Sequence, residues 1–422
     1  MNDEIKDSED IEPQIDVDVD EIMNNVSLNM DDNEPEDEQP KKTNKVESEI
    51  VDVENLEDLT PSAEDEELTK ELYSEFSSFL ENKADITEDT GVKLTISTGI
   101  DLVDAILGGG FAVGALNIVV GQPGSGKSML AIQTLGQGQR QYGGKLIGGF
   151  LDSEESTTTL RLSNLGVRFP KLKPYVDITV EKVFKFIEGL CVFKEQKKIV
   201  PTPSVVVWDS IANTLSQKER ETDDPNTVIG YKARLLSILV PKYVAKCAQH
   251  NICLLAVNQL RDVLSLGQFA PPKDLKFMSA TKDMPGGNVL KFNAFQLVEM
   301  KVKTAISEKG AEKSDNYGFE GVIVTMKCVK NKLFPPNVEI PVVGSFTTGF
   351  SNFWTNYNFL KQTKRLNAGA WNYLVSLPDK KFRTKDAPNL YKTDASFKKA
   401  FDTASKEAIK TEIIDKYNPD ID

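Results

Sequence analysis

One segment constrains the fold of this chain more than any other, and it reads Gly121-Gln122-Pro123-Gly124-Ser125-Gly126-Lys127-Ser128. It fits the P-loop pattern, a Gly followed by any four residues and then Gly, Lys and Ser or Thr, whose backbone N–H groups cradle phosphates. An apolar run at residues 115–120 precedes it, and a helix-like run at residues 129–135 follows it. A strand, a loop and a helix in this order direct N–H groups at anionic oxygens. The segment therefore predicts an α/β fold that binds a nucleoside triphosphate.

The net charge of −14 conceals two oppositely charged parts of the chain. Residues 1–70 carry 26 acidic and five basic side chains, whereas residues 71–422 carry 45 basic and 38 acidic ones. An acidic protein repels nucleic acid, but a basic body joined to an acidic tail need not. We therefore keep nucleic acid among the expected partners. The tail is then a local competitor of nucleic acid, a site for a partner protein, or a solvated leader without function.

The chain lacks the features expected of a membrane or secreted protein. No apolar run approaches the length of a membrane span, and the first residues, Met-Asn-Asp-Glu, do not resemble a signal peptide. The four cysteines show no CxxC pairing, which favours buried thiols in a reducing cytoplasm over metal ligands. His250 is the only histidine, so His-dependent triads are excluded and we expect a carboxylate as the catalytic base.

Composition and periodicity divide the chain into four parts. Residues 1–65 are rich in Asp, Glu, Asn and Pro and nearly free of aromatic residues, which predicts a disordered acidic tail. In residues 66–95, apolar side chains recur at four-residue steps and predict an amphipathic helix, which packs on its own domain or docks on a neighbouring subunit. These side chains are Leu68, Leu72, Phe76 and Leu80. Residues 96–345 form the predicted ATPase core, and residues 346–422 form a C-terminal region with a Lys-rich helix at 396–417.

Seven apolar runs predict the strands of the core. Four of them are continuously apolar, as buried parallel strands are. These four are residues 115–120, 146–151, 205–209 and 252–257. Three later runs are more closely spaced and predict a meander that extends the sheet: residues 295–302, 321–329 and 338–343. We therefore expect an α/β fold with a mostly parallel central sheet, and a small α+β region at the C-terminus.

Several side chains near the predicted phosphate site carry the expected chemistry. Lys127 is expected to bond the β- and γ-phosphates, and the Ser128 hydroxyl to bind Mg²⁺. Asp209 ends a strand as a Walker B carboxylate does, and is expected to hold the metal through water. The run Asp152-Ser153-Glu154-Glu155 ends the strand after the P-loop helix, where a carboxylate can polarise the attacking water. The same run also fits an N-cap cluster for the next helix, and the spacing leaves both interpretations open.

Two further segments have the composition of surface loops on the same face of the sheet. Residues 214–229 are polar and mixed in charge, and residues 261–285 combine Lys with Phe and Met. Cations interleaved with apolar side chains suit single-stranded nucleic acid. Composition alone does not distinguish such a surface from a long solvated loop.

Taken together, these segments resemble the RecA family of DNA recombinases, including the phage recombinases of the UvsX type. The similarity runs in matching order from about residue 97 to residue 341. It is carried by Ser97-Thr98-Gly99-Ile100-Asp101, Ile106-Leu107-Gly108-Gly109-Gly110, Leu151-Asp152-Ser153-Glu154, Gly166-Val167, Asn258-Gln259, Gly286-Gly287-Asn288-Val289-Leu290-Lys291-Phe292 and Val329-Lys330-Asn331-Lys332. P-loops occur in many families, whereas the Gly-Gly-Asn and Lys-Asn-Lys runs together are specific.

The resemblance implies a RecA-like P-loop ATPase core that binds ATP and Mg²⁺ between neighbouring subunits. It assigns catalytic roles to Glu154 as the water-activating residue, to Lys127, to Gln259 as a sensor of the γ-phosphate, and to Lys330 and Lys332 as cations inserted into the next subunit's site. It assigns nucleotide contacts to Gly121, Gln122, Pro123, Gly124, Ser125, Gly126, Lys127, Ser128, Met129, Asp209 and Arg161, with Ser128 and Asp209 at the metal. Arg161 stands where the family usually has a tyrosine that stacks on adenine.

The resemblance also assigns residues 214–229 and 261–285 as the first and second DNA loops. Ile229 is the implied base-step wedge of the first loop, and Arg234 an implied backbone contact. The remaining implied DNA-binding residues are Arg261, Leu264, Gly286, Gly287 and Asn288. The second loop is longer than in the bacterial proteins, and residues beyond 346 match the family only loosely.

The implied function is that of a DNA-dependent ATPase that forms a helical filament on single-stranded DNA, pairs it with double-stranded DNA and exchanges strands. Single-stranded-DNA-binding and mediator proteins are implied partners, and the implied location is the cytoplasm of a bacterium or of a phage's bacterial host. One alternative is a ring-forming hexameric helicase motor on the same core, against which the Gly-Gly-Asn run argues. Another is an ATP-gated DNA-binding scaffold that exchanges no strands, and the complete set of metal, base and cation candidates argues against it.

Overall fold

The structure is a computed structural model that describes residues 93–168, 175–222, 224–262, 282–306, 317–369 and 371–417. The predicted acidic tail, nearly all of the predicted N-terminal helix and most of the second DNA loop, including Leu264, lie outside the described residues. The described residues belong to one compact unit, Lys93–Asp422. Within them, no helix has both the length and the apolar character needed to cross a membrane.

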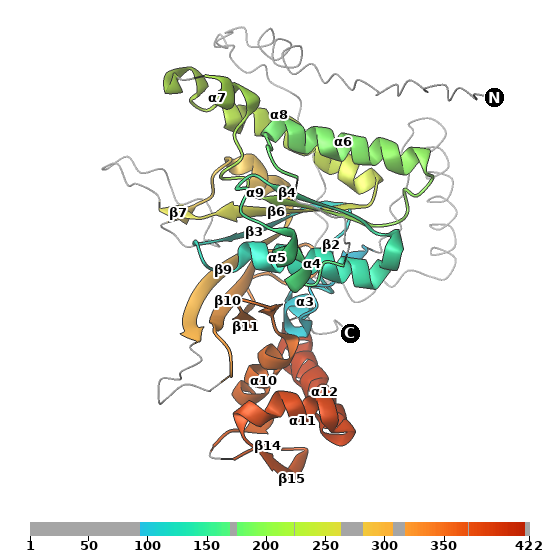
Figure 1. Ribbon diagram of the computed structural model, residues 1–422, viewed down its shortest axis with the longest axis vertical. Helices are drawn as coiled ribbons and strands as arrows, with labels where there is room; N and C mark the ends of the chain where they lie inside the picture. Colours follow the sequence, from blue (N-terminus) through green and yellow to red (C-terminus); the bar gives the residue numbers. More distant parts are fainter. Residues whose placement is uncertain are drawn as a thin grey trace, which may run out of the picture. The chain divides into compact units, whose positions relative to one another are not determined.

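An eight-stranded sheet forms the core, with strand order β12-β11-β10-β9-β3-β6-β5-β4 (Figure 1). Neighbours from β9 to β4 pair in parallel, and β10, β11 and β12 continue from β9 in antiparallel pairs. The strands are β3 (Ala115–Gly121), β4 (Ile147–Asp152), β5 (Ser204–Asp209), β6 (Ile252–Gln259), β9 (Ala294–Ile306), β10 (Gly321–Lys330), β11 (Glu339–Ser345) and β12 (Gly349–Phe350). All seven predicted strands are present, so the expected mostly parallel α/β sheet is confirmed.

The central strands form where they do because helices cover both of their faces. Every residue of β3 and β5 is buried, which explains why these strands are continuously apolar rather than alternating. The helix α4 (Lys127–Tyr142) packs on β5 and β6, while α8 (Tyr231–Gln249) packs on β3 and β6 from the other face, beside α6 (Val180–Gln196) (Figure 1). The faces of the central strands are therefore covered, and the loops that connect strands to helices lie at the strand ends.

Short elements occupy the connections. They are β1 (Thr95–Ile96), α3 (Asp101–Leu107), β2 (Phe111–Ala112), η2 (Gly143–Lys145), α5 (Thr159–Asn164), α7 (Gln217–Glu221), η3 (Pro225–Val228), β7 (Arg261–Asp262), β8 (Lys282–Asp283) and α9 (Asn288–Asn293). The predicted first DNA loop thus contains α7 and η3 rather than being structureless. The cause is local, because Ser216 and Glu219 form a capping box at the start of α7.

The C-terminal region combines helices with a small three-stranded antiparallel sheet, as the composition predicted. Its elements are α10 (Asn352–Gln362), β13 (Leu366–Asn367), β14 (Asn372–Leu374), β15 (Leu377–Phe382), η5 (Thr384–Asp386), α11 (Ala387–Thr393), α12 (Ala395–Ile409), the π-helical turn η6 (Lys410–Ile414) and α13 (Asp415–Tyr417). Aromatic contacts fill its interior. For example, the rings of Phe353 and Phe401 are stacked with their centroids 4.9 Å apart. This explains the aromatic character of the sequence after residue 346.

Candidate ATP site and the surfaces around it

The P-loop connects β3 to α4 and has a fixed backbone. Gly124 and Gly126 have φ values of +76° and +85°, a left-handed conformation that glycine adopts without a Cβ clash. The Ser125 hydroxyl donates to the Gln122 carbonyl at 2.8 Å, and the Lys127 ammonium donates to the same carbonyl at 2.9 Å. A Cβ placed on Gly124 would meet no atom within 4 Å other than those of Gly124 and its two chain neighbours. The loop is therefore open to solvent at this position.

The flanking residues of the loop are fixed by close packing. A Cβ on Gly121 would lie 2.4 Å from the Met300 carbonyl oxygen, so this position tolerates only glycine. Met129 is 4% exposed, and its side chain lies near Phe350 beneath the loop. Gln122 and Pro123 are exposed at the tip. Met129 can consequently meet a nucleotide only through its backbone, whereas the tip residues face the solvent side.

Two carboxylates lie next to the P-loop at the ends of adjacent strands. Asp209 ends β5 and pairs in register with Asp152 at the end of β4. The pKa of Asp209 is raised to about 6, chiefly by burial; a hydrogen bond from Ser128 and the charge of Lys127 oppose the rise, and the neighbouring carboxylates of Glu154 and Asp152 contribute to it. Desolvation likewise lowers the pKa of Lys127, although Asp209 and Glu154 oppose that shift. Lys127, Ser128 and Asp209 therefore form one electrostatically coupled group.

The pair Ser128 and Asp209 fits a Mg²⁺ ion. Their side chains are already joined by a hydrogen bond, and Asp209 is only 5% exposed. Among the described residues, no group of three or more His, Cys, Asp or Glu side chains could hold a metal by itself. Mg²⁺ in phosphate-binding sites usually takes one or two protein ligands and completes its octahedron with phosphate oxygens and water. The observed donor set is of this kind.

Glu154 is held beside the same group by partners that follow β5. Its Oε1 atom accepts hydrogen bonds from the Ser210 hydroxyl at 3.0 Å and from the Asn213 side-chain amide. Asp152 accepts from the Glu154 backbone N–H at 3.0 Å, so the turn that presents Glu154 is itself fixed. The motifs did not point to Ser210 or Asn213, although both directly follow the predicted Walker B strand.

The N-cap interpretation of the carboxylate run does not hold. Helix α5 begins after Thr158, whose side chain accepts from the Arg161 backbone N–H at 3.2 Å. Asp152 instead accepts from Thr157 at 2.8 Å and closes a turn before the helix. Glu154 is therefore free of a capping role and lies close enough to Lys127 and Asp209 to affect the pKa of both.

The end of β6 connects the P-loop with the segment that closes the second DNA loop. Gln259 pairs in register with Gly121 of the P-loop strand. Its neighbour Asn258 is fully buried and donates from its side chain to the Pro285 carbonyl at 2.7 Å. The next residue, Gly286, has φ +103°, and a Cβ there would lie 2.4 Å from the Leu290 side chain. The backbone at position 286 therefore requires glycine, and the segment that begins there is tied through Pro285 and Asn258 to the strand end that carries Gln259.

Lys330 and Lys332 lie toward the opposite end of the strands. Lys330 pairs with Leu297 of β9, and Leu297 pairs with Ile118, three residues before the P-loop begins at Gly121. At about 3.3 Å per residue, this is about 10 Å below the loop along the strands. The chain runs further from the loop beyond Lys330, and the Lys332 ammonium lies 5.5 Å from the centre of the Phe295 ring. The two cations therefore face away from the P-loop of their own chain.

Arg161 lies in α5 and is bound to the edge of the sheet. Its guanidinium donates to the Phe346 carbonyl at 2.6 Å, and the Phe346 side chain is 51% exposed. Met129 follows the P-loop, and its side chain and that of Phe350 both lie close to Gly344, two residues before Phe346. Arg161 and Phe346 are therefore a planar cation and a ring on this side of the P-loop, and a base is expected to lie there.

The predicted DNA-binding residues are partly described. Ile229 is 77% exposed between η3 and α8, and Arg234 is exposed on the first turns of α8. Arg261 begins β7, which pairs with β8 across the base of the second loop. Gly287 and Asn288 are exposed at the start of α9. Ile229 lies just before α8 in the sequence, and the Gly287-Asn288 pair lies at the start of α9. The two helices α8 and α9 pack against each other.

Comparison with known proteins gives a consistent result. A family model described as the RecA N-terminal domain matches residues 82–351. The chain is 30% identical over 242 residues to Protein RecA of Desulforapulum autotrophicum, a match that covers 57% of this chain and 62% of the relative. It is 27% identical to Protein RecA of Rippkaea orientalis, over 66% of this chain and 72% of the relative, and 27% identical to Protein RecA of Borrelia hermsii, over 66% and 71%. The first of these matches spans less than two thirds of the relative's length, and the matched domain ends before α10.

Proposed function

The chain belongs to the RecA family, and from this premise we propose that it is a DNA-dependent ATPase that assembles on single-stranded DNA and exchanges strands with a homologous duplex. One observation carries the proposal. Lys127, Asp209 and Glu154 gather at one end of the sheet, whereas Lys330 and Lys332 face away from that end. A phosphate chain on Lys127 would therefore lack the second pair of cations unless a neighbouring subunit supplied them.

Each residue of the phosphate end has a role that follows from its contacts. Lys127 would exchange its bond to the Gln122 carbonyl for the β- and γ-phosphate oxygens. Ser128 and Asp209 would hold a Mg²⁺ ion, which when bound neutralises phosphate charge and orients the oxygens. Glu154 would accept a hydrogen bond from the attacking water and take its proton. The Ser210 and Asn213 donors orient the Glu154 carboxylate for this.

Gln259 would couple this chemistry to DNA. It stands beside the P-loop in register with Gly121, and the adjacent Asn258 is bonded to Pro285 at the close of the second loop. A γ-phosphate that attracts Gln259 would thereby bias the segment that holds Gly286, Gly287, Asn288 and, before them, Arg261 and Leu264. Ile229 and Arg234 would contribute a base-step wedge and a phosphate contact from the first loop. DNA and ATP would then favour the same arrangement of the chain.

Lys330 and Lys332 would complete the site of the next subunit. Cations placed where negative charge develops are among the largest contributions to phosphoryl-transfer catalysis. Burial and the charge of Lys332 lower the pKa of Lys330. Residues 66–95 would serve as the arm that joins neighbouring subunits, and a helical filament would result. Single-stranded-DNA-binding and mediator proteins would act on that filament.

A strand-exchange assay with ATP, combined with electron microscopy of the DNA complex, tests the proposal. We expect exchange of homologous strands and a helical filament that depends on ATP and Mg²⁺. Closed rings that unwind duplexes processively would favour a hexameric helicase motor. ATP-dependent DNA binding without strand exchange would favour a scaffold. A protein that stays monomeric with Mg²⁺, ATP and oligonucleotide, and yet hydrolyses ATP at full rate, would contradict the proposal.

A further inference from the structure

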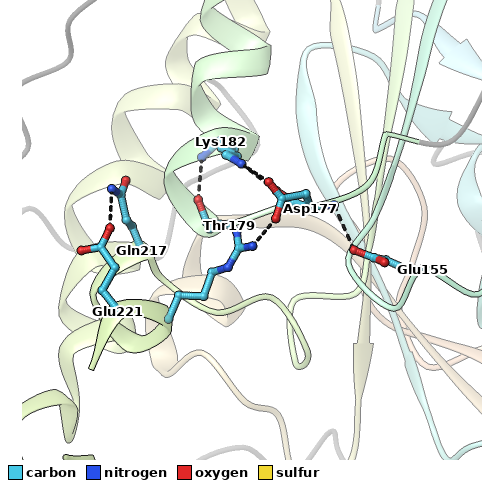
Figure 2. Close-up of polar contacts among 7 residues, drawn as sticks. Glu155, Asp177, Thr179, Lys182, Gln217 and Glu221 are labelled. Carbon is cyan, nitrogen blue, oxygen red and sulfur yellow. Dashed lines mark hydrogen bonds and ion pairs between the residues drawn. The ribbon is translucent and has the colours of Figure 1, made fainter. Parts of the chain in front are cut away.

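Three segments that are distant in sequence meet at Asp177: its own segment, that of Glu155 and that of Arg220 (Figure 2). The Lys182 ammonium lies 2.5 Å from this carboxylate, and the Arg220 guanidinium contacts its other oxygen. These two cations lower the pKa of Asp177, so its side chain remains ionised at neutral pH. On the opposite side, the Asp177 backbone N–H donates to Glu155 at 3.2 Å. Asp177 therefore joins α7 of the first DNA loop to the residue that follows Glu154.

The backbone at this junction is held in an uncommon conformation. Asp177 has φ +61° and Glu155 has φ +52°, both in the left-handed region that residues other than glycine seldom occupy. Lys182 also donates to the Asp177 carbonyl at 3.0 Å, so both backbone polar groups of Asp177 have partners. Strained backbone persists where its surroundings determine it from several directions, and such places cluster at functional sites.

Helix α7 is attached firmly enough to transmit a displacement. The Val180 N–H donates to the Leu215 carbonyl at 3.0 Å just before the helix. The first N–H of the helix, at Gln217, donates to the Glu181 carboxylate of α6 at 2.9 Å. Thus α7 is tied to the same 175–182 segment by its first turn and by Arg220. A shift of α7 would move this segment rather than be absorbed by a loose connection.

We propose that Asp177 is a positioning residue that couples the first DNA loop to the hydrolytic carboxylate Glu154, with Arg220 as its partner on the loop. The inference rests on the proposed function, since it presumes that DNA stimulates ATP hydrolysis. Ile229 on the exposed loop would contact DNA, and the resulting order of α7 would be passed through Arg220 and Asp177 to Glu155. The existing contacts of Glu154 with Ser210 and Asn213 would then be held more rigidly. Asp177 itself touches no reacting atom.

The test uses the full-length chain with Asp177→Asn and, separately, Arg220→Gln. Asn keeps the size of Asp and its tolerance of left-handed backbone, and Arg220 lies on an exposed helix, so neither change should prevent folding. We expect DNA-stimulated kcat to fall about threefold to tenfold in each variant. Turnover without DNA, the KM for ATP and the melting temperature should stay as in the unaltered protein. Combining both changes should reduce the stimulated kcat no further than the stronger single change, because both break one contact.

Two variants of α7 serve as matched controls. Glu221→Gln alters the same helix, where Glu221 accepts from Gln217 at 2.8 Å and does not contact Asp177 (Figure 2). It should leave DNA stimulation unchanged. Arg220→Lys keeps a cation within reach of Asp177 and should restore most of the stimulation that Arg220→Gln removes.

The outcomes separate this inference from the proposed function. If DNA stimulates the unaltered protein but Asp177→Asn and Arg220→Gln behave like it, the coupling role of Asp177 is refuted and the proposed function stands. The inference is also refuted if stimulated and unstimulated turnover fall in parallel, or if the two changes multiply when combined. If DNA fails to stimulate the unaltered protein, the proposed function itself is refuted.

Discussion

In the function that we propose, the two ends of the central sheet carry opposite parts of one phosphate site. Near the carboxyl end of β3, acidic Asp209 and Glu154 surround a single buried cation, Lys127. At the other end, Lys330 donates to the Lys291 and Phe292 carbonyls, and burial together with the charge of Lys332 lowers the pKa of Lys330. In the proposed function, the first end would bind the nucleotide and the metal but has few cations with which to stabilise a transition state. The second end would supply the missing cations. Assembly of neighbouring subunits would bring the two ends together.

The largest effect should come from removing the cations of the second end. We expect Lys330→Ala with Lys332→Ala to reduce DNA-stimulated ATP turnover by about 10³-fold, because cations supplied to a phosphoryl transfer contribute this much or more. Nucleotide binding should stay nearly unchanged, as measured by fluorescence titration, since Lys127 belongs to the other end. Undiminished turnover in the double variant would rule out a shared site.

Lys332→Ala alone is the cleaner control for that experiment. Lys330 caps the carbonyls at the end of α9, so its removal also costs local structure, whereas Lys332 stacks near the Phe295 ring. We expect the single Lys332 variant to retain the melting temperature of the unaltered protein and still lose turnover. A loss of turnover only in variants that also melt earlier would assign these lysines a structural role.

Glu154→Gln should give the next largest effect, at the first end. Gln keeps an acceptor for Ser210 but cannot take a proton, so we expect turnover to fall by about 10²-fold while ATP and DNA still bind. Mixing this variant with the Lys330/Lys332 double variant should restore part of the activity, because some junctions then combine two intact ends. Normal turnover in Glu154→Gln, with a loss in Glu155→Gln, would move the base to Glu155.

Asp209→Asn tests how much the buried, ionised carboxylate of Asp209 lowers the stability of the folded protein. Its pKa is raised from 3.8 to about 6 by burial, which corresponds to about 3 kcal/mol that the ionised carboxylate costs the folded state. The cost is absent below the unfolded pKa, grows as the pH rises towards 6, and is complete above it. Lost contacts to Ser128 and Lys127 offset part of it, so we expect a gain of about 1–2 kcal/mol at pH 7.5.

Thermal unfolding without nucleotide measures that gain. The melting temperature of Asp209→Asn should exceed that of the unaltered protein at pH 7.5, and the difference should shrink at pH 4.5. Mg²⁺-dependent turnover should be lost in the same variant. A difference that grows toward low pH would show that Asp209 is stabilised as a carboxylate and that the proposed direction of its pKa is wrong.

The comparison of the two ends also shows what the sequence could predict. The P-loop, the strands and Asp209 lie in contiguous motifs whose local pattern fixes their structure, and those strands are confirmed. The partners of Glu154 could not be predicted, because Ser210 and Asn213 reach it across 56 and 59 residues of chain. The bond from Arg161 to Phe346 spans 185 residues. Such contacts depend on how β4, β5 and the sheet edge pack, which spacing does not encode.

Helix α7 could have been predicted from the sequence. The polar composition of residues 214–229 predicts a loop, but Ser216-Gln217-Lys218-Glu219 is a capping-box pattern, which marks the start of a helix. The contact of Arg220 with Asp177 was not predictable, since it depends on the left-handed turn at residue 177. Sequence patterns therefore predict the candidate reacting groups, and the contacts that position them become visible only in the fold.

The smallest expected effect is the difference in stability between removing one asparagine at each end. Asn258 and Asn331 both donate to a backbone carbonyl, of Pro285 at 2.7 Å and of Ile106 at 3.0 Å, and both accept from a nearby backbone N–H. Asn258 is fully buried, whereas Asn331 is half-buried. An unpaired buried carbonyl costs about 1–3 kcal/mol, so Asn258→Ala should lower the free energy of unfolding by about 2 kcal/mol and Asn331→Ala by about 1 kcal/mol or less. Urea midpoints at constant m-value measure both. Equal losses in the two variants would show that the buried hydrogen bonds of Asn258, at the P-loop end of the sheet, stabilise the fold no more than those of Asn331 at the other end.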